Sequence, residues 1–365
     1  MHKYFKLATL TLCLTPLMAP VCQADEDDIQ GDTLYTLSNA SQNAVYALHI
    51  DNWGNTTSVK HFATGGKGTT TGLGNQGALA LSHDHRFLFA VNAGSNEVSV
   101  FKINENGLVL LDHVKESGVT PISITVSHDK VYVVNSGDNS IFGYQFDRSK
   151  GKLHPLAKSY LSLGSMGAGA AQISFNKDGD TLVVTEKANS KITSILLDDD
   201  GIPATTYTIN SAGNTPFGFA FGHHDSFFVS EAEGGAANAA TVSAYKLQEN
   251  GEIKLLDKAV AVGKTAACWL ATTPNGRMAF TADTPASSLS SFAIDHAGNL
   301  TLLMSQAVIA NTPTDLVVSH DGNILYSLNN GDHSIGVYGI EWNGGLKSIS
   351  SISGIPAGAT GLVLR

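Results

Sequence analysis

Three acidic residues, Glu186, Glu231 and Asp283, hold the same place in a segment that recurs along the chain. Each closes a short apolar run and begins a turn. If the repeats form a closed ring, equivalent residues lie at similar height and radius, so the three carboxylates would face one mouth of a central channel. Carboxylates that lie close together could supply a general base or acid for hydrolysis of a cyclic ester. They could equally hold Ca²⁺ or Mg²⁺, hard cations that prefer oxygen ligands and can polarise a carbonyl group.

The same place in the repeat also has a purely structural explanation. Its occupants in chain order are Ser38, Asn92, Asn135, Glu186, Glu231, Asp283 and Asn329. Asn, Asp and Ser often begin turns because their side chains cap backbone N–H groups. Glu is a poor turn former, so this explanation fits the two Glu members less well. Both interpretations stay open, and we include Asn135 and Asn329 among the candidate substrate-binding residues of that mouth.

A second set of equivalent residues begins the innermost strand of each repeat. Its members are Gly77, Ile122, Ala171, Phe217, Cys268, Thr314 and Thr360, and the next positions include Gln172, Trp269 and Asp315. Small and apolar residues suit strands that crowd around an axis, so packing is the main role predicted for this set. Trp269 could offer a stacking wall for a sugar, and Gln172 and Trp269 complete the candidate substrate-binding residues. Cys268 is predicted to be a buried packing residue because no His lies near it in the sequence to form a thiolate.

The elements that must position these residues are short strands in a sevenfold repeat. The copies are LYTLSNA, LFAVNAG, VYVVNSG, LVVTEKA, FFVSEAE, AFTADTP and LYSLNNG, which start at residues 34, 88, 131, 182, 227, 279 and 325. Each repeat of about 45–50 residues reads as four strands separated by Gly, Asn, Asp and Ser turns, which is typical of a propeller blade. The first repeat lacks an innermost strand and the chain ends in a surplus one, TGLVLR. We therefore predict an all-β, seven-bladed β-propeller of four-stranded blades, closed by the C-terminal strand joining the first blade.

Charge and the N-terminus restrict the partners and the compartment. The formal net charge of −10 argues against a nucleic-acid backbone or an anionic membrane surface as partner. Residues 1–24 have a basic start and an apolar run too short to span a bilayer comfortably, which predicts a signal peptide and no membrane span. An acidic lead-in over residues 25–32 and the propeller over 33–365 would follow. The protein is thus expected to be exported, periplasmic or secreted, with Cys22 leaving a lipid anchor open as an alternative.

Histidines recur in the turns that follow the innermost strands. His83, His128 and His320 lie in S-H-D turns, and His223 and His224 occupy a similar turn. One such turn per blade spreads these residues around the ring, so they are not expected to converge on a metal ion. We predict that all five are solvated.

The repeats resemble a known family. The turns SHDH, SHDK, NKDG, TPNG and SHDG, together with LFAVNAGSNEVSVF and ACWLATTPNGRMAFTADTPASSLSSFAI, resemble the seven-bladed propeller lactonases. That family includes propeller-type 6-phosphogluconolactonases and carboxymuconate-lactonising enzymes. The resemblance covers essentially the whole chain after the predicted signal peptide. It implies a hydrolase of carbohydrate metabolism that acts on a lactone.

The residues that the resemblance would place at the mouth are mostly absent. Family enzymes are expected to carry a His, one or two Arg and a Glu there. The position of the His is occupied by Ile122, that of the first Arg by Ala171 and Gln172, and the later Arg turn reads SEAEG. Only Glu186 matches the expected Glu.

Two functions therefore remain open. The first is an exported hydrolase of a lactone or sugar-derived ester, with Glu186 as general base and Glu231 and Asp283 as electrostatic or metal partners. Three carboxylates would favour a neutral or cationic substrate, or a site assisted by Ca²⁺ or Mg²⁺; no cofactor is required by the sequence. The alternative is a non-catalytic scaffold that binds a saccharide, a peptide or an envelope partner.

Overall fold

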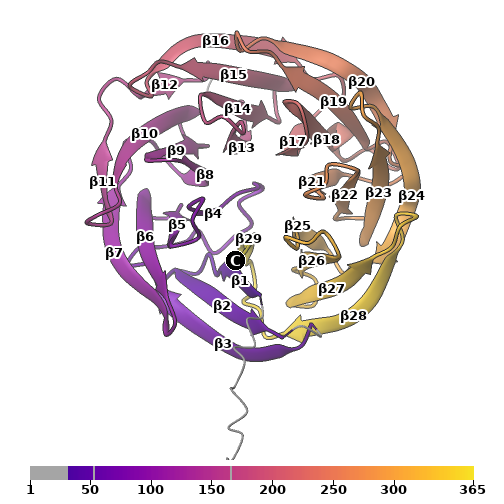
Figure 1. Ribbon diagram of the computed structural model, residues 1–365, viewed down its shortest axis with the longest axis horizontal. Coiled ribbons are helices and arrows are strands. Elements are labelled where there is room, and N and C mark those ends of the chain that lie inside the picture. The colour runs from indigo at the N-terminus through magenta and orange to yellow at the C-terminus, as the bar shows by residue number, and fades with distance from the viewer. Residues whose placement is uncertain (1–31, 52–53, 165–166) are drawn as a thin grey trace, which may run out of the picture. The chain divides into compact units, whose positions relative to one another are not determined.

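The repeated apolar runs form strands that are arranged as seven blades around a central axis (Figure 1). The computed structural model describes residues 32–51, 54–164 and 167–365. The predicted signal peptide and nearly all of the acidic lead-in lie outside the described residues. Residues Gly31–Arg365 form one compact unit. No helix in the described part of the chain is long and apolar enough to cross a membrane.

Each blade has its strands in sequence order from the axis outward, apart from the first, which begins with the C-terminal strand. The first consists of β29 (Thr360–Leu364), β1 (Thr33–Leu37), β2 (Ala44–Ile50) and β3 (Thr56–Ala63). The second consists of β4 (Leu79–Leu81), β5 (Phe87–Asn92), β6 (Glu97–Asn104) and β7 (Gly107–Lys115). The third consists of β8 (Pro121–Ser127), β9 (Lys130–Asn135) and β10 (Ser140–Asp147), with β11 (Lys152–Pro155) and β12 (Leu161–Ser162) both paired to β10. The fourth consists of β13 (Ala170–Phe175), β14 (Thr181–Glu186), β15 (Lys191–Leu197) and β16 (Pro203–Asn210).

The remaining three blades repeat the same order. The fifth consists of β17 (Pro216–Phe221), β18 (Ser226–Glu231), β19 (Thr241–Leu247) and β20 (Ile253–Ala261), with one 3₁₀ turn, η1 (Glu233–Gly235), after β18. The sixth consists of β21 (Ala267–Thr272), β22 (Met278–Asp283), β23 (Ser288–Ile294) and β24 (Leu300–Ile309). The seventh consists of β25 (Pro313–Val318), β26 (Ile324–Asn329), β27 (Ser334–Ile340) and β28 (Leu346–Ser353).

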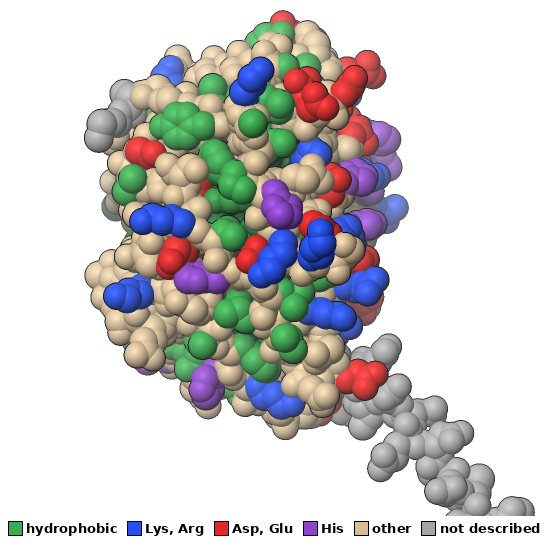
Figure 2. All heavy atoms as spheres, turned by 90° about the vertical axis from the view of Figure 1, so that its left-hand side faces the viewer, with side chains coloured by type: hydrophobic (Ala, Val, Ile, Leu, Met, Phe, Trp, Pro, Cys, Tyr) green, Lys and Arg blue, Asp and Glu red, His purple; other side chains and the backbone are tan. Residues whose placement is uncertain are grey.

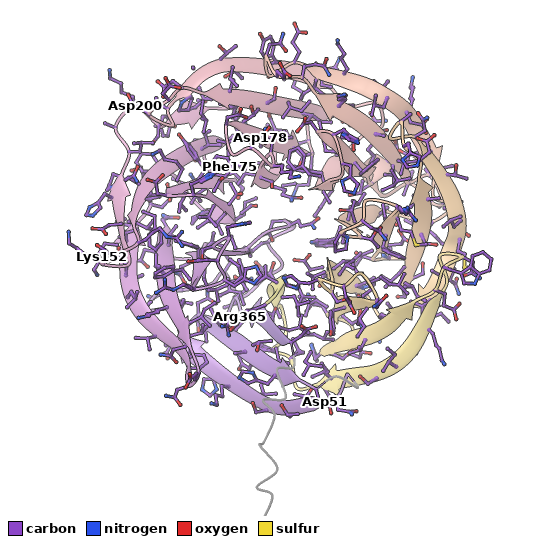
Figure 3. The ribbon with its side chains drawn as sticks, viewed as in Figure 1. Asp51, Lys152, Phe175, Asp178, Asp200 and Arg365 are labelled. Atoms are coloured by element: carbon purple, nitrogen blue, oxygen red, sulfur yellow. The ribbon has the colours of Figure 1, made fainter. Side chains whose placement is uncertain are left out.

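Burial along the strands follows their distance from the axis. In β14 all six residues are buried, because a second strand is covered by the neighbouring blade on each face. In the outermost strand β16 every residue is exposed or half-buried instead. Figure 3 shows the same gradient: Phe175 and Arg365 lie toward the middle of the ring, whereas Lys152 and Asp200 lie at its rim. Aromatic side chains fill the space between blades, as where Phe87 and Phe146 meet edge to face with ring centroids 4.9 Å apart.

The C-terminal strand closes the ring, as the sequence predicts. β29 pairs antiparallel with β1, and Thr33 and Arg365 exchange two backbone hydrogen bonds of 2.9 Å. The seventh blade is attached to this strand by Asp315. Its carboxyl group accepts the backbone N–H of Leu316 at 2.8 Å and that of Leu362 in β29. Pairing with β29 covers the inner edge of β1, which would otherwise be a site for edge-to-edge association.

Candidate functional site

Glu186, the predicted general base, is completely buried between the third and fourth blades. Its Oε2 accepts a hydrogen bond from Asn189 Nδ2 at 2.8 Å, and Asn139 Nδ2 of the third blade lies 3.5 Å away. Its Oε1 accepts one from Thr193 Oγ1 at 3.2 Å. The carboxylate therefore joins two blades through amide and hydroxyl groups.

Glu231 is buried just as fully in the fifth blade. Its Oε1 accepts hydrogen bonds from Ser211 Oγ at 2.9 Å and from the backbone N–H of Gly213 at 2.8 Å. Its Oε2 accepts hydrogen bonds from Thr241 Oγ1 at 2.6 Å and Ser243 Oγ at 2.8 Å. Four short donors satisfy both oxygens, so this side chain links β19 to the segment that enters β17.

Asp283 repeats the arrangement in the sixth blade with fewer donors. Thr281 Oγ1 donates at 2.9 Å and Ser290 Oγ at 2.5 Å, while Ser288 Oγ lies 3.4 Å away. Burial raises the pKa of Asp283 to about 7. The hydroxyl donors oppose this rise without cancelling it.

The amide members of the same set are placed alike. Asn92 Oδ1 accepts from Asn43 Nδ2 at 3.0 Å and Thr64 Oγ1 at 2.6 Å, and so joins the first blade to the second. Asn135 and Asn329, predicted to contact substrate, are buried and lie 3.4 Å from Ser hydroxyls of their own blades. The structure thus gives the whole set one position, buried between strands rather than open to a mouth.

The three carboxylates do not form one ligand set. In the described parts of the chain there is no group of three or more His, Cys, Asp and Glu side chains that could hold a metal ion. Each carboxylate is instead surrounded by N–H and O–H donors, which suit an anion and would repel a cation. These surroundings do not fit Ca²⁺ or Mg²⁺. The catalytic role of Glu186, Glu231 and Asp283 stays a prediction, and their surroundings favour a structural one.

Gln172 connects adjacent innermost strands. Its Nε2 donates to the carbonyl of Phe219 at 3.0 Å, and its Oε1 accepts the N–H of the same residue at 2.7 Å. The side-chain amide thereby acts as an extra peptide group between β13 and β17. We call this arrangement an amide clasp.

A second amide clasp is made by a loop that reaches toward the axis. The loop, residues 64–78, joins β3 to β4, and Figure 1 shows it inside the ring of innermost strands. Its Gln76 donates to the carbonyl of Leu270 at 2.8 Å and accepts the N–H of Leu270 at 3.2 Å. At the position of the fifth blade that corresponds to Gln172, Gly218 has no side chain, and a Cβ there would overlap the side-chain oxygen of Gln76. Gln76 therefore takes the space that a side chain at residue 218 would occupy, and it bonds Leu270 of β21 in the way that Gln172 bonds Phe219 of β17.

Trp269 holds the same loop. Its indole Nε1 donates to the carbonyl of Asn75 at 2.7 Å, and its ring lies 4.9 Å from that of Phe217. Thr360 Oγ1 donates to Asn75 Oδ1 at 3.0 Å from the closing strand. Trp269 and Phe217 are both buried and pack against each other, and the role of Trp269 as a stacking wall for a sugar stays a prediction.

Lys187 is the chemically distinctive residue near the axis, and sequence reasoning missed it. Its ammonium group donates to the carbonyl of Gly74 and lies 4.8 Å from the centroid of the Phe217 ring. Within the described residues no carboxylate lies at ion-pair distance from it. Burial lowers the pKa of this half-buried amine. The neighbouring Cys268 is a thiol whose pKa burial raises to about 12.

We define the axial cluster as Lys187, Phe217, Cys268 and Trp269. A signal for Lys187 was present in the sequence. The residues directly after the recurrent carboxylate or amide are Asn39, Ala93, Ser136, Lys187, Ala232, Thr284 and Asn330. Lys187 is the charged member of that set, and successive strand residues point to opposite faces. Lys187 accordingly leaves β14 on the side of the fifth blade, where its long side chain reaches Phe217 and Gly74, whereas Glu186 faces the third blade.

Comparison with known proteins agrees with this architecture. A family model described as "Lactonase, 7-bladed beta-propeller" matches residues 28–167 and 231–355. A protein from Bacteroides uniformis ATCC 8492, provisionally assigned as a 6-phosphogluconolactonase, has 16% identity and a TM-score of 0.76, covering 92% of this chain and 100% of that one. The periplasmic gluconolactonase of Pseudomonas aeruginosa has 16% identity and a TM-score of 0.71, covering 91% and 99%. At such identities the likeness concerns the fold alone.

A curated relative matches only a short segment. It is an uncharacterized protein of Staphylococcus saprophyticus, 28% identical over 81 residues. The matched segment covers 21% of this chain and 24% of that protein.

Proposed function

We propose that this chain, which belongs to the seven-bladed β-propeller lactonase family, binds a small sugar-derived lactone at the axial cluster and opens its ring. Lys187 is the group that we assign to the ester carbonyl. The observation that supports this assignment is a half-buried ammonium group with one hydrogen-bond acceptor among the described residues, the carbonyl of Gly74. An ammonium group has three N–H donors, so two remain for a ligand.

The surroundings of Lys187 suit an oxygen atom that carries or gains negative charge. Removing an ammonium group from water is unfavourable unless an anionic or strongly polar partner replaces the water. Phe217 offers the face of its ring, which stabilises the cation without neutralising it. The sequence favoured a neutral or cationic substrate only because it placed three carboxylates at the mouth. The charged group near the axis is instead the ammonium of Lys187, which favours a substrate with an electron-rich oxygen.

The reaction that we propose is addition of water to the lactone carbonyl carbon. The carbonyl oxygen becomes an oxyanion, the ring C–O bond breaks, and the ring oxygen leaves as a hydroxyl group after taking a proton. The product is a hydroxy acid. Lys187 would stabilise the oxyanion, a contribution of about 10²–10³-fold in rate where such donors have been removed. Trp269 and Phe217 would pack against the sugar ring.

The test is a panel of sugar lactones followed by acid release. Lys187→Met keeps most of the side-chain volume and removes the charge, and we expect kcat/KM to fall about 100-fold or more. Lys347→Met, on an exposed face of β28, is the matched control and should keep the wild-type rate. Glu186→Gln tests the predicted general base in the same panel. Equal rates for Lys187→Met and the wild-type protein would exclude the proposed role of Lys187.

A second candidate function is binding without turnover. It is favoured by the buried state of Glu186, Glu231 and Asp283 and by Ile122 at the position where the resemblance expects a His. The lactone panel separates the two functions when calorimetry is added. Heat of binding that depends on Lys187 without acid release would identify a binding protein for a sugar acid or lactone.

We also infer that the protein is exported. Support comes from the basic start and apolar run of residues 1–24 and from the structural likeness to a protein described as periplasmic. Mass spectrometry of the protein from its native host should find a mature chain that begins at Asp25. A chain that retains Met1 would contradict the inference.

A further inference from the structure

A cavity of about 680 Å³ lies between the fifth and sixth blades, away from the axial cluster. It is formed by the turns β17–β18, β21–β22 and β23–β24 together with residues of β19 and β20. These turns connect strands at their far ends from Lys187 and Phe217, so the cavity opens on the opposite side of the ring. Its volume is in the range of small-molecule sites.

The cavity is lined by unpaired cationic and imidazole groups. Lys246 and Arg277 are exposed, and neither makes an ion pair within the described parts of the chain. His223, His224 and His296 add imidazole N–H donors to the same wall. Figure 2 shows the ring edge-on from the side of the second and third blades, where histidine and charged side chains gather along one flat side; the cavity itself lies on the side hidden in this view.

The carboxylate in the cavity wall, Asp295, is hydrogen-bonded within its own turn. Asp295 accepts the backbone N–H groups of Ala297 and Asn299 at 2.8 and 2.9 Å and the Asn299 side-chain amide at 2.8 Å. Hydrogen bonding from Asn299 lowers the pKa of Asp295, which therefore stays ionised and fixes the turn. Neither Lys246 nor Arg277 forms an ion pair with this carboxylate.

The fifth and sixth blades approach each other closely at the cavity wall. Gly276 has φ +61°, and a Cβ there would overlap the His223 ring. The imidazole of the fifth blade consequently lies against the backbone of the sixth. Leu256 and Ile294 add apolar surface beside the charged groups. A ligand would meet donors on one side and an apolar surface on the other.

We propose that this cavity binds a small dianion, such as a phosphate monoester or a dicarboxylate. Two cations and several neutral donors match two negative charges, and the planar guanidinium of Arg277 can bind two oxygens at once. A metal ion is the wrong class of ligand, because Lys246 and Arg277 would repel it. The site is separate from the axial cluster and does not depend on the function proposed for it.

The experiment is calorimetry on the full chain with inorganic phosphate, a hexose phosphate and succinate as probes. The wild-type protein should bind at least one of them with one site per chain. Arg277→Gln and Lys246→Met should each weaken binding at least tenfold. Arg86→Gln is the matched control, because Arg86 holds the same place in the β4–β5 turn as Arg277 holds in the β21–β22 turn. It should leave the affinity unchanged.

A further variant tests the cavity without touching a charge. Ala297 is an exposed wall residue, and Ala297→Trp should fill the space and abolish binding while the thermal midpoint stays near that of the wild-type protein. Preference for the phosphates or for succinate identifies the kind of dianion and supports the site in either case. Failure of all three probes at millimolar concentration would overturn the proposal. So would equal loss of affinity in Arg86→Gln and Arg277→Gln, which would indicate diffuse attraction to the whole surface.

Discussion

Replacing Asp315 with Asn should change how the stability of the ring depends on pH. Burial raises the pKa of Asp315 to about 8, far above the ordinary value for Asp of about 4. Between these values the native protein keeps a proton that the unfolded chain has lost. The contribution of Asp315 to stability is therefore fully present below about pH 4 and is lost as the pH rises toward 8.

The size of this pH dependence follows from the difference between the pKa values of Asp315 in the native and the unfolded protein. For one group, the free energy of unfolding falls by about 1.4 kcal/mol for each pH unit in this range. Asn cannot ionise, yet its side-chain oxygen can still accept the N–H groups of Leu316 and Leu362. The advantage of Asp315→Asn over the wild-type protein should thus grow by about 2.7 kcal/mol from pH 5 to pH 7. Asp283 and Glu116, whose pKa values burial raises to about 7, are present in both proteins and cancel in the difference.

The assay is urea unfolding of both proteins at pH 5, 6 and 7, with the free energy taken from the midpoint and slope. Asp295→Asn is the control, because hydrogen bonds lower the pKa of this exposed group and it is ionised throughout the range. Its difference from the wild-type protein should not vary between pH 5 and 7. Parallel pH profiles for Asp315→Asn and the wild-type protein would refute the argument that Asp315 is protonated in the closed ring.

Three further predictions concern the axis and the buried polar groups. Gln76→Ala should destabilise the protein by about 2–4 kcal/mol, because it leaves the N–H and carbonyl of Leu270 without partners. Gln172→Ala should destabilise it by a similar amount, because its clasp has the same geometry. Thermal unfolding measures both effects. Cys268 should resist alkylation by iodoacetamide at pH 8 until urea is added, because its thiol pKa of about 12 leaves almost no thiolate. Mass spectrometry of the peptide that contains Cys268 measures the extent of alkylation. Glu231→Leu should destabilise the fold by at least about 3 kcal/mol, since four donors lose their acceptor; unfolding at or above the wild-type midpoint would show that these donors find water instead.

The fold could be predicted because the same information is repeated seven times. Strand period, turn residues and the surplus strand at the C-terminus all indicate one closed ring, and β29 pairs with β1 as expected. The site could not be predicted in the same way. Glu186 and Lys187 are neighbours in sequence and their side chains point to different places, so a shift of one residue decides which of them faces the axis.

Contacts between distant segments were also hidden from sequence reasoning. The clasp between Gln76 and Leu270 joins residues 194 positions apart, and no local sequence pattern predicts it. The close approach of His223 to Gly276 depends on how two blades meet. Equivalent positions in a ring repeat their backbone surroundings, while the side chains that reach across the ring do not repeat.

The clasp made by Gln76 also has a consequence for the order in which the ring is assembled. A chain that grows from its N-terminus produces residues 64–78 long before the strand β21 that receives them. The clasp must therefore stay open while four blades are made, and it forms only when the sixth blade is present. Once the clasp has formed, the loop connects blades on opposite sides of the ring. The backbone N–H of Gln76 also donates to the carbonyl of Ala171 at 3.1 Å, so moving the sixth blade away from the fourth requires release of this loop.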